Sequence, residues 1–164
     1  MSRGTAAGQA ADEPAAAPGP GATPGRRAVG VDLGSRRIGI AVSDRTGSLA
    51  FPWGVVERSG DPAGERRRIA EVVAELEAGT VVVGMPLSLD GRAGPAARAA
   101  AGEAERLAEE LAPAGVTVDT FDERLTTVSA QAALAGAGTR GRAARRRIDS
   151  AAAAVLLQAW LDAR

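Results

Sequence analysis

The sequence predicts an α/β domain built on a mixed five-stranded sheet, in which three antiparallel strands come first and parallel strands follow, with helices flanking the sheet. Three observations predict this class. β-rich segments joined by tight links open the folded region, and segments with apolar residues at helical spacing then alternate with further β-rich runs. The run TVVVGMP at 80–86 is typical of a strand covered on both faces. A chain of 164 residues is long enough for one such domain, which we expect over 28–164.

Residues 1–27 differ in composition from the rest of the chain. They are Ala, Gly and Pro with scattered charges and hold no large apolar side chain after Met1, so they cannot bury enough surface to offset the entropy of ordering. We expect a disordered tail. No segment has the apolar core of a secretory signal and no apolar run is long enough to span a bilayer, so the sequence predicts a cytoplasmic protein with no membrane partner. The absence of Cys agrees with that compartment.

The first three strands are expected over 28–33, 37–43 and 50–57. Ser35–Arg36 makes a tight link, which joins the first two strands as a hairpin. Pro52 has no backbone N–H to donate to a neighbouring strand, so it places the third strand at an edge or in a bulge.

Helices and strands alternate after the third strand. Asp61–Pro62 has the pattern of an N-cap followed by Pro at the first helical position, and apolar residues at helical spacing continue to Glu77 before Gly79–Thr80 ends the helix. A second helix is expected over 95–112, and GVTVDTFDE at 115–123 predicts the last strand.

The C-terminal part is predicted to be helical with one interruption. Helix signals run from Thr126 or Thr127 to Leu134, and the last helix is expected over about 149–161. Between them the Gly- and Arg-rich stretch AGAGTRGRAARRR breaks the apolar pattern, and we expect a mobile loop there.

The composition limits the chemistry that this chain can perform. It contains no His, no Cys and no Tyr, which excludes Ser-His triads, thiol nucleophiles, zinc sites of the Cys/His type and acid–base catalysis by His. Any reaction must therefore use carboxylates, hydroxyls, Arg or a hard cation held by oxygen ligands.

Acidic residues stand at the ends of several predicted elements: Asp32 at the end of the first strand, Asp122 and Glu123 at the end of the last, and Asp149 at the start of the last helix. Ligand sites in such sheets form beyond the strand ends, where several elements converge. Carboxylates brought together repel one another unless a cation neutralises them, and Mg²⁺ or Mn²⁺ suits a site made only of oxygen atoms. Two such ions about 3.5–4 Å apart support phosphodiester cleavage.

Each of these acids also has a structural interpretation. Asp32 could accept hydrogen bonds from backbone amides in the turn at Gly34–Ser35, and Asp149 could cap the last helix. Asp122 and Glu123 could be exposed charges, with Glu123 paired to the neighbouring Arg. The residues alone leave both interpretations open.

Basic charge is concentrated in one stretch, although the formal net charge is zero. Residues 139–147 hold five arginines and no acid, a pattern suited to gripping phosphates, and a solvated loop is the alternative interpretation. The arginines are Arg140, Arg142, Arg145, Arg146 and Arg147. With two Phe and two Trp in the chain, recognition of a nucleic-acid backbone is favoured over base stacking.

Four sequence blocks follow one another between residues 28 and 162: VGVDLGSRRIGIAVSD, VVVGMPLSLDG, DERLTTVSAQ and IDSAAAAVLLQAWLD. Together and in this order they closely resemble the bacterial YqgF family of pre-16S rRNA nucleases, which are also described as Holliday-junction-resolvase-like proteins. The resemblance covers everything except the tail.

The resemblance implies a ribonuclease-H-like fold with acidic metal ligands on the first strand, near the DER block and on the final helix. In this chain they correspond to Asp32, Glu123 and Asp149, with Asp122 in a neighbouring catalytic position. Related resolvases use an acid at the end of the fourth strand, whereas that strand ends here in Gly84–Met85–Pro86, so the DER block must supply the acid. Strand alternation sends Asp122 and Glu123 to opposite faces, and we favour Glu123 as the ligand.

Other parts of the blocks acquire nucleic-acid-binding roles under the same resemblance. Ser35 would let a phosphate approach the backbone beside Asp32. Arg124 and Thr126 would contact the scissile strand or order the neighbouring acid, and the arginines of 140–147 would hold the nucleic-acid backbone.

The function implied by the resemblance is a Mg²⁺- or Mn²⁺-dependent endonuclease with two ions, which acts on structured RNA and matures the 5′ end of precursor 16S rRNA in the pre-ribosome. One alternative is cleavage of four-way DNA junctions, for which a homodimer would place two sites symmetrically. Another is a non-catalytic RNA-binding assembly factor. A kinase-like protein, suggested by the D-x-G-[ST] pattern, is disfavoured because the chain is too short for a two-domain ATP cleft.

Overall fold

The computed structural model describes residues 25–126 and 141–164, and its centre is one five-stranded sheet in the order β3-β2-β1-β4-β5. The strands are β1 (Arg27–Leu33), β2 (Arg37–Ser43), β3 (Ala50–Glu57), β4 (Ala78–Met85) and β5 (Thr117–Asp122). β1, β2 and β3 pair antiparallel, and β4 and β5 extend the sheet in parallel from β1. The predicted mixed sheet is confirmed.

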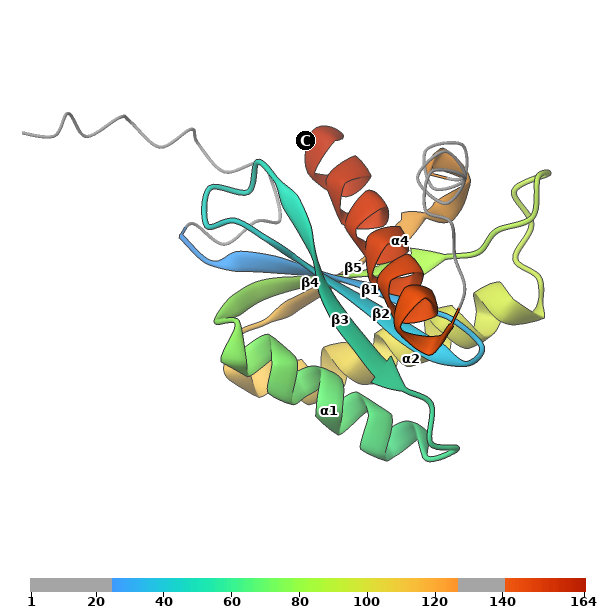
Figure 1. Cartoon of the computed structure of the whole chain (residues 1–164), viewed down its shortest axis with the longest axis horizontal. Coiled ribbons are helices and arrows are strands. Elements are labelled where there is room, and N and C mark those ends of the chain that lie inside the picture. The colour runs from blue at the N-terminus through green and yellow to red at the C-terminus, as the bar shows by residue number, and fades with distance from the viewer. Residues whose placement is uncertain (1–24, 127–140) are drawn as a thin grey trace, which may run out of the picture.

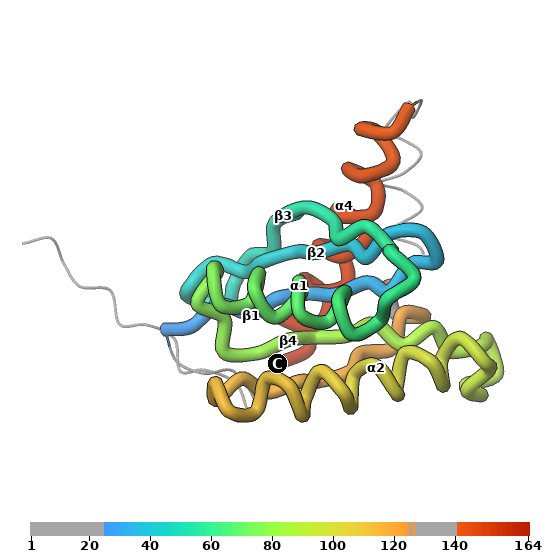
Figure 2. Tube along the Cα trace, turned by 90° about the horizontal axis from the view of Figure 1, so that it is seen from below, coloured from blue at the N-terminus to red at the C-terminus, as the bar shows by residue number. Residues whose placement is uncertain are grey.

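Helices cover both faces of this sheet (Figure 1). α1 (Pro62–Glu75) and α2 (Pro95–Leu111) lie on one face, whereas α4 (Arg142–Asp162) crosses the other face, as the rotated view also shows (Figure 2). Short 3₁₀ turns, η1 (Ala112–Ala114) and η2 (Glu123–Leu125), precede and follow β5. Within the described ranges, no helix combines the length and the apolar character that crossing a membrane requires.

Strand alternation divides the apolar residues of β1 and β4 between two cores. Val29 and Val31 pack with residues of α1 and α2 in the larger core, and Val81 and Val83 join them from β4. The intervening positions of these strands face α4, where a smaller core contains Ala28, Val82, Ala153, Leu157 and Trp160. Asp32 belongs to the same alternate set of β1 positions as Ala28, so the fold directs it toward α4.

Two glycines let the backbone of α4 approach the sheet closely. A Cβ on Gly30 of β1 would lie 2.9 Å from the Leu157 Cβ, and a Cβ on Gly39 of β2 would overlap the Asp149 carbonyl oxygen. Gly39 is also the residue directly opposite Asp32 in the β1–β2 ladder. The missing side chain at Gly39 therefore fixes where the Asp149 backbone lies, which is beside Asp32.

The third strand forms the edge of the sheet, as Pro52 predicts. The register between β2 and β3 shifts between Ile40 and Ala41, so the strand is irregular next to Pro52. Phe51 and Trp53 on this strand keep 49% and 38% of their surface exposed.

The structure changes the predicted signals at both ends of the first helix. Asp61 is the N-cap residue, but its side chain makes no capping hydrogen bond; Glu65 instead accepts a hydrogen bond from the Ser59 backbone N–H at 2.8 Å. The helix ends before Glu77, which adopts a left-handed φ of 53°, and Gly79 already belongs to β4. A Glu in this conformation gives no sequence signal for a helix end.

The expected loop before the last helix is corrected. α4 begins at Arg142, so Arg142, Arg145, Arg146 and Arg147 are helical and Asp149 lies inside the helix rather than at its N-cap. Arg is a good helix former, and this intrinsic propensity outweighed the missing apolar pattern. Arg140 and the predicted helix from Thr127 to Leu134 fall outside the described residues, as do residues 1–24 of the expected tail.

We predict that Gly39→Ala lowers the free energy of unfolding by about 1–3 kcal/mol, because the new methyl group displaces α4 from the sheet. Urea denaturation measures the change. Gly54→Ala is the matched control on β3, where a Cβ would meet no atom within 4 Å, and we expect it to shift the value by less than about 1 kcal/mol. Equal effects of the two substitutions would contradict the close packing at Gly39.

Candidate nuclease site

Asp32 and Glu123 come together at the end of the sheet where β1 and β5 end. Asp32 faces the α4 side of β1, and Glu123 is the first residue after β5. The Glu123 side chain lies across Gly84 of β4, where a Cβ would overlap its carboxyl group. Through this gap Glu123 reaches Asp32, and the two carboxyl groups share a hydrogen bond.

Burial and mutual repulsion change the protonation of this pair. Burial raises the pKa of Asp32, and the negative charge of Asp149 raises it further, while the hydrogen bond with Glu123 acts in the opposite direction. Burial, reinforced by the charge of Asp32, raises the pKa of Glu123 to about 7. Without a cation, two adjacent carboxyl groups keep a proton between them near neutral pH, and a bound cation would replace that proton.

Asp149 approaches the pair from α4 but its carboxylate is held by Arg37. The Arg37 Nε donates a hydrogen bond to the Asp149 Oδ2 at 2.5 Å. The Arg37 side chain is 14% exposed and that of Asp149 is 32% exposed, so the pair is largely shielded from solvent. Arg37 is therefore not a solvated hairpin residue.

Asp122 takes no part in this cluster. Its carboxylate accepts hydrogen bonds from the Arg124 backbone N–H at 2.9 Å and from the Arg124 guanidinium group. The Arg124 side chain, through these bonds, lowers the pKa of Asp122. The structure thus separates the two acids of the DER block: Glu123 joins Asp32, and Asp122 orders Arg124.

The side chains of Asp32, Glu123 and Asp149 offer only oxygen atoms, which are the ligands that a hard cation such as Mg²⁺ prefers. As the side chains lie, no three acidic residues in the described ranges are close enough to hold an ion. The backbone of Asp149 is already seated at Gly39, opposite Asp32. The charge of Asp149 already acts on Asp32, so this carboxylate is the third oxygen donor near the pair.

The predicted nucleic-acid-binding residues occupy different environments. Ser35 and Arg124 are exposed, whereas Thr126 is buried and its hydroxyl donates a hydrogen bond to the Glu123 carbonyl at 2.8 Å. Thr126 therefore orders the turn that carries Glu123 and is not placed to touch a nucleic acid.

The arginines of α4 lie within two helical turns of Asp149. Arg142, Arg145 and Arg147 are exposed, and Arg146 donates a hydrogen bond to the Glu57 carboxylate on β3 at 2.6 Å. The exposed arginines thus project from the segment that leads directly into the site.

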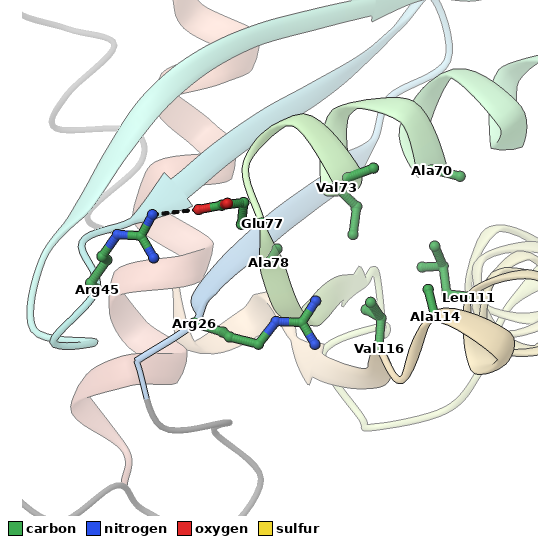
Figure 3. A pocket seen from close by; sticks show the side chains of 10 residues that line it. Arg26, Arg45, Ala70, Val73, Glu77, Ala78, Leu111, Ala114 and Val116 are labelled. Atoms are coloured by element: carbon green, nitrogen blue, oxygen red, sulfur yellow. Dashed lines mark hydrogen bonds and ion pairs between the residues drawn. The ribbon is translucent and has the colours of Figure 1, made fainter.

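Two depressions lie at opposite ends of the sheet. A groove of about 710 Å³ adjoins Glu123 and is bordered by the loop 86–90 and by Arg124. A second pocket, of about 520 Å³, lies near the start of β1 and β4, with an apolar floor and an ion pair between Arg45 and Glu77 at its rim (Figure 3). None of the candidate site residues lines this second pocket.

Sequence reasoning did not place Arg37 or Gly39 beside the acids. A signal for both was present, because residues 37, 39 and 41 of a strand share one face, and the hairpin pairs that face with Asp32. The position of Asp149 on that face could not be read in the same way, since the start of α4 was expected to be a loop.

The sheet order and the acids at the strand ends define a ribonuclease-H-like fold of the resolvase type. The chain is similar in structure to RuvC of T. thermophilus in complex with a Holliday junction substrate, with a TM-score of 0.52 and 18% identity over 85% of this chain and 95% of that one. It is also similar to the yeast mitochondrial Holliday junction resolvase Ydc2, with a TM-score of 0.53 and 10% identity over 85% and 79% of the two chains. These similarities confirm the predicted fold.

The family model RuvX, described as Holliday junction resolvase, matches residues 26–163, and the chain belongs to this family. A relative from Mycobacterium sp. (strain KMS), named "Putative pre-16S rRNA nuclease", is 51% identical over 148 residues, which cover 90% of this chain and 86% of the relative. One of the same name from Nocardia farcinica (strain IFM 10152) is 48% identical over 160 residues, covering 94% and 88%. The predicted family and the prediction of a nuclease are confirmed.

We predict that the metal-free protein loses stability as the pH rises from about 5 to about 8. The folded state raises the pKa of Glu123 from its ordinary 4.5 to about 7, so over this range it retains a proton that the unfolded chain has released. The stabilisation is complete below pH 4.5 and is lost as the pH rises through 7. The full shift corresponds to about 3 kcal/mol, and screening of this partly exposed group reduces the expected loss to about 1–2 kcal/mol.

Urea denaturation in EDTA at several pH values measures this loss. Glu123→Gln is expected to flatten the dependence, whereas Asp122→Asn, at a carboxyl group tied to Arg124, should retain it. A flat profile for the unsubstituted protein, or the same slope in Glu123→Gln, would show that Glu123 does not hold this proton.

Proposed function

We propose that this chain is a divalent-metal-dependent endonuclease that hydrolyses phosphodiester bonds in structured RNA and matures the 5′ end of precursor 16S rRNA in the cytoplasm. The observation that carries the proposal is the hydrogen-bonded pair of Asp32 and Glu123, on which the charge of Asp149 acts from α4, next to the exposed arginines of that helix. A fold gains no stability by gathering half-buried like charges, so such a cluster indicates a cationic ligand. The names of the relatives supply the RNA substrate.

Asp32, Glu123 and Asp149 would hold Mg²⁺ or Mn²⁺, and we propose two ions. When bound, the ions supply an activated water and neutralise charge at the leaving oxygen. Asp122 has a different task in this proposal: it fixes the guanidinium group of Arg124 at the edge of the groove beside Glu123, where it can contact a phosphate.

The exposed arginines of α4 would grip the backbone of the RNA. Arg142, Arg145 and Arg147 project from the first turns of the helix, and Asp149 follows them on the same helix within two turns of Arg142. Phosphates held along these turns would place a neighbouring phosphodiester at the carboxylate cluster. Contacts of this kind position a nucleic acid without reading its sequence.

We predict that Asp32→Asn abolishes Mn²⁺-dependent cleavage of precursor 16S rRNA, with a loss of at least about 100-fold, because removal of this ligand charge weakens ion binding. Cleavage is followed with the purified full-length chain, with and without Mn²⁺, on the RNA and on a synthetic four-way DNA junction. Asp61→Asn, at an exposed acid that begins α1 on the sheet face opposite α4, is the matched control.

Each outcome decides between the candidate functions. Metal-dependent cutting of the RNA that Asp32→Asn loses and Asp61→Asn keeps supports the proposal. Preferential cutting of the junction would assign the protein to DNA resolution, and binding without cutting would make it an assembly factor. Unchanged cutting by Asp32→Asn would place the reaction elsewhere.

We predict that replacing Arg142, Arg145 and Arg147 together by Gln reduces the slope of log affinity against log salt concentration by about 2–3, since each lost phosphate contact removes about one counterion released. Fluorescence anisotropy with labelled RNA measures the slope. The control is Arg66→Gln with Arg68→Gln and Arg106→Gln, which removes the same charge from the α1–α2 layer on the opposite face of the sheet. An equal slope in both triple variants would rule out this helix as the contact surface.

A further inference from the structure

The ion pair between Arg37 and Asp149 occupies a ligand of the proposed ion site. Arg37 begins β2, and its Nε lies 2.5 Å from the Asp149 Oδ2. The residue opposite Arg37 in the β2–β3 ladder is Glu57, whose carboxylate is bound to Arg146 at 2.6 Å. Arg37 is therefore paired with Asp149 rather than with Glu57, which lies opposite it on β3 and is paired with Arg146.

This pair balances part of the negative charge of the three acids. Asp32, Glu123 and Asp149 place several negative groups close together, and the Arg37 guanidinium is the cation hydrogen-bonded to one of them. The Asp149 carboxylate is bound to Arg37, and within the described ranges the three acids are not close enough to hold one ion as their side chains lie. Binding of a cation by all three acids therefore requires Asp149 to leave Arg37.

An arginine that loses this partner needs another anion, because its side chain is only 14% exposed and a shielded, unpaired charge is costly. The anion that reaches this place in a nuclease is a phosphate of the nucleic acid. A guanidinium group matches phosphate oxygens in geometry as well as it matches a carboxylate.

We propose that Arg37 is a positioning residue that holds the Asp149 carboxylate away from the ion site in the free protein and exchanges it for a substrate phosphate when the ion and the nucleic acid bind. This role rests on the proposed function. It couples the two ligands: an ion that draws Asp149 away frees Arg37 for the phosphate, and a phosphate that engages Arg37 frees Asp149 for the ion. Such coupling is reciprocal by thermodynamic necessity.

The test measures Mn²⁺ affinity of the full-length chain by titration calorimetry without RNA. Arg37→Gln removes the competitor for Asp149, and we expect Mn²⁺ to bind about 3–10-fold more tightly. Arg37→Lys keeps the charge and should restore an affinity near that of the unsubstituted protein. Arg45→Gln is the matched control, since Arg45 and Glu77 form an ion pair of the same 2.5 Å length at the opposite end of the sheet (Figure 3).

A second measurement separates this role from a structural one. In saturating Mn²⁺, Arg37→Gln should raise the KM for RNA about 3–10-fold, because the phosphate contact is lost, while the Mn²⁺ affinity changes in the opposite direction. A residue that merely supports the fold would weaken both, and thermal unfolding shows whether each variant is folded. Unchanged or weaker Mn²⁺ binding by a folded Arg37→Gln would overturn the proposal.

The two levels of inference fail in distinguishable ways. If the unsubstituted chain binds no Mn²⁺ and cuts no RNA, the proposed function is wrong. If the unsubstituted chain does both, and Arg37→Gln matches it in Mn²⁺ affinity and in KM, the role of Arg37 alone is wrong.

Discussion

The packing of the α4 backbone onto Gly39 is the constraint on which the rest of the site depends. The sheet alone brings the carboxylate on β1 close to the turn after β5. Asp149 comes from a helix, so its position depends on how closely and at which residue that helix packs on the sheet. The contact of the Asp149 carbonyl with Gly39, supported by Gly30 against Leu157, sets that position. Gly84 likewise leaves the space across which the Glu123 side chain reaches Asp32. The glycines at these three positions therefore let the acids approach one another.

The arrangement is costly for the folded chain, and the surrounding residues offset part of the cost. Three acids face one region, and the structure responds by raising the pKa of Asp32 and Glu123 and by pairing Asp149 with Arg37. A protein selected for stability alone would replace such a cluster with apolar side chains. Keeping it makes sense when a ligand of opposite charge belongs there.

Sequence reasoning predicted the strands, their directions and the separation of Asp122 from Glu123. Successive side chains of a strand point to opposite faces, so this information is present in short stretches of sequence. It missed the start of α4, since Arg142 to Arg147 carry no apolar stripe and a flanking Gly indicated a loop. It also missed the end of α1, where Glu77 takes a conformation usually left to Gly. The pairing of Arg37 with Asp149 joins residues 112 positions apart, which no local pattern reports.

The irregular edge strand affects how copies of this chain can meet. Pro52 has no amide hydrogen to donate to a further strand, and the register shift beside it makes this edge irregular. These features disfavour extension of the sheet by a neighbouring molecule at this edge, although Phe51 and Trp53 leave apolar surface exposed there. Association through that edge would use contacts between side chains rather than a continued ladder of backbone hydrogen bonds.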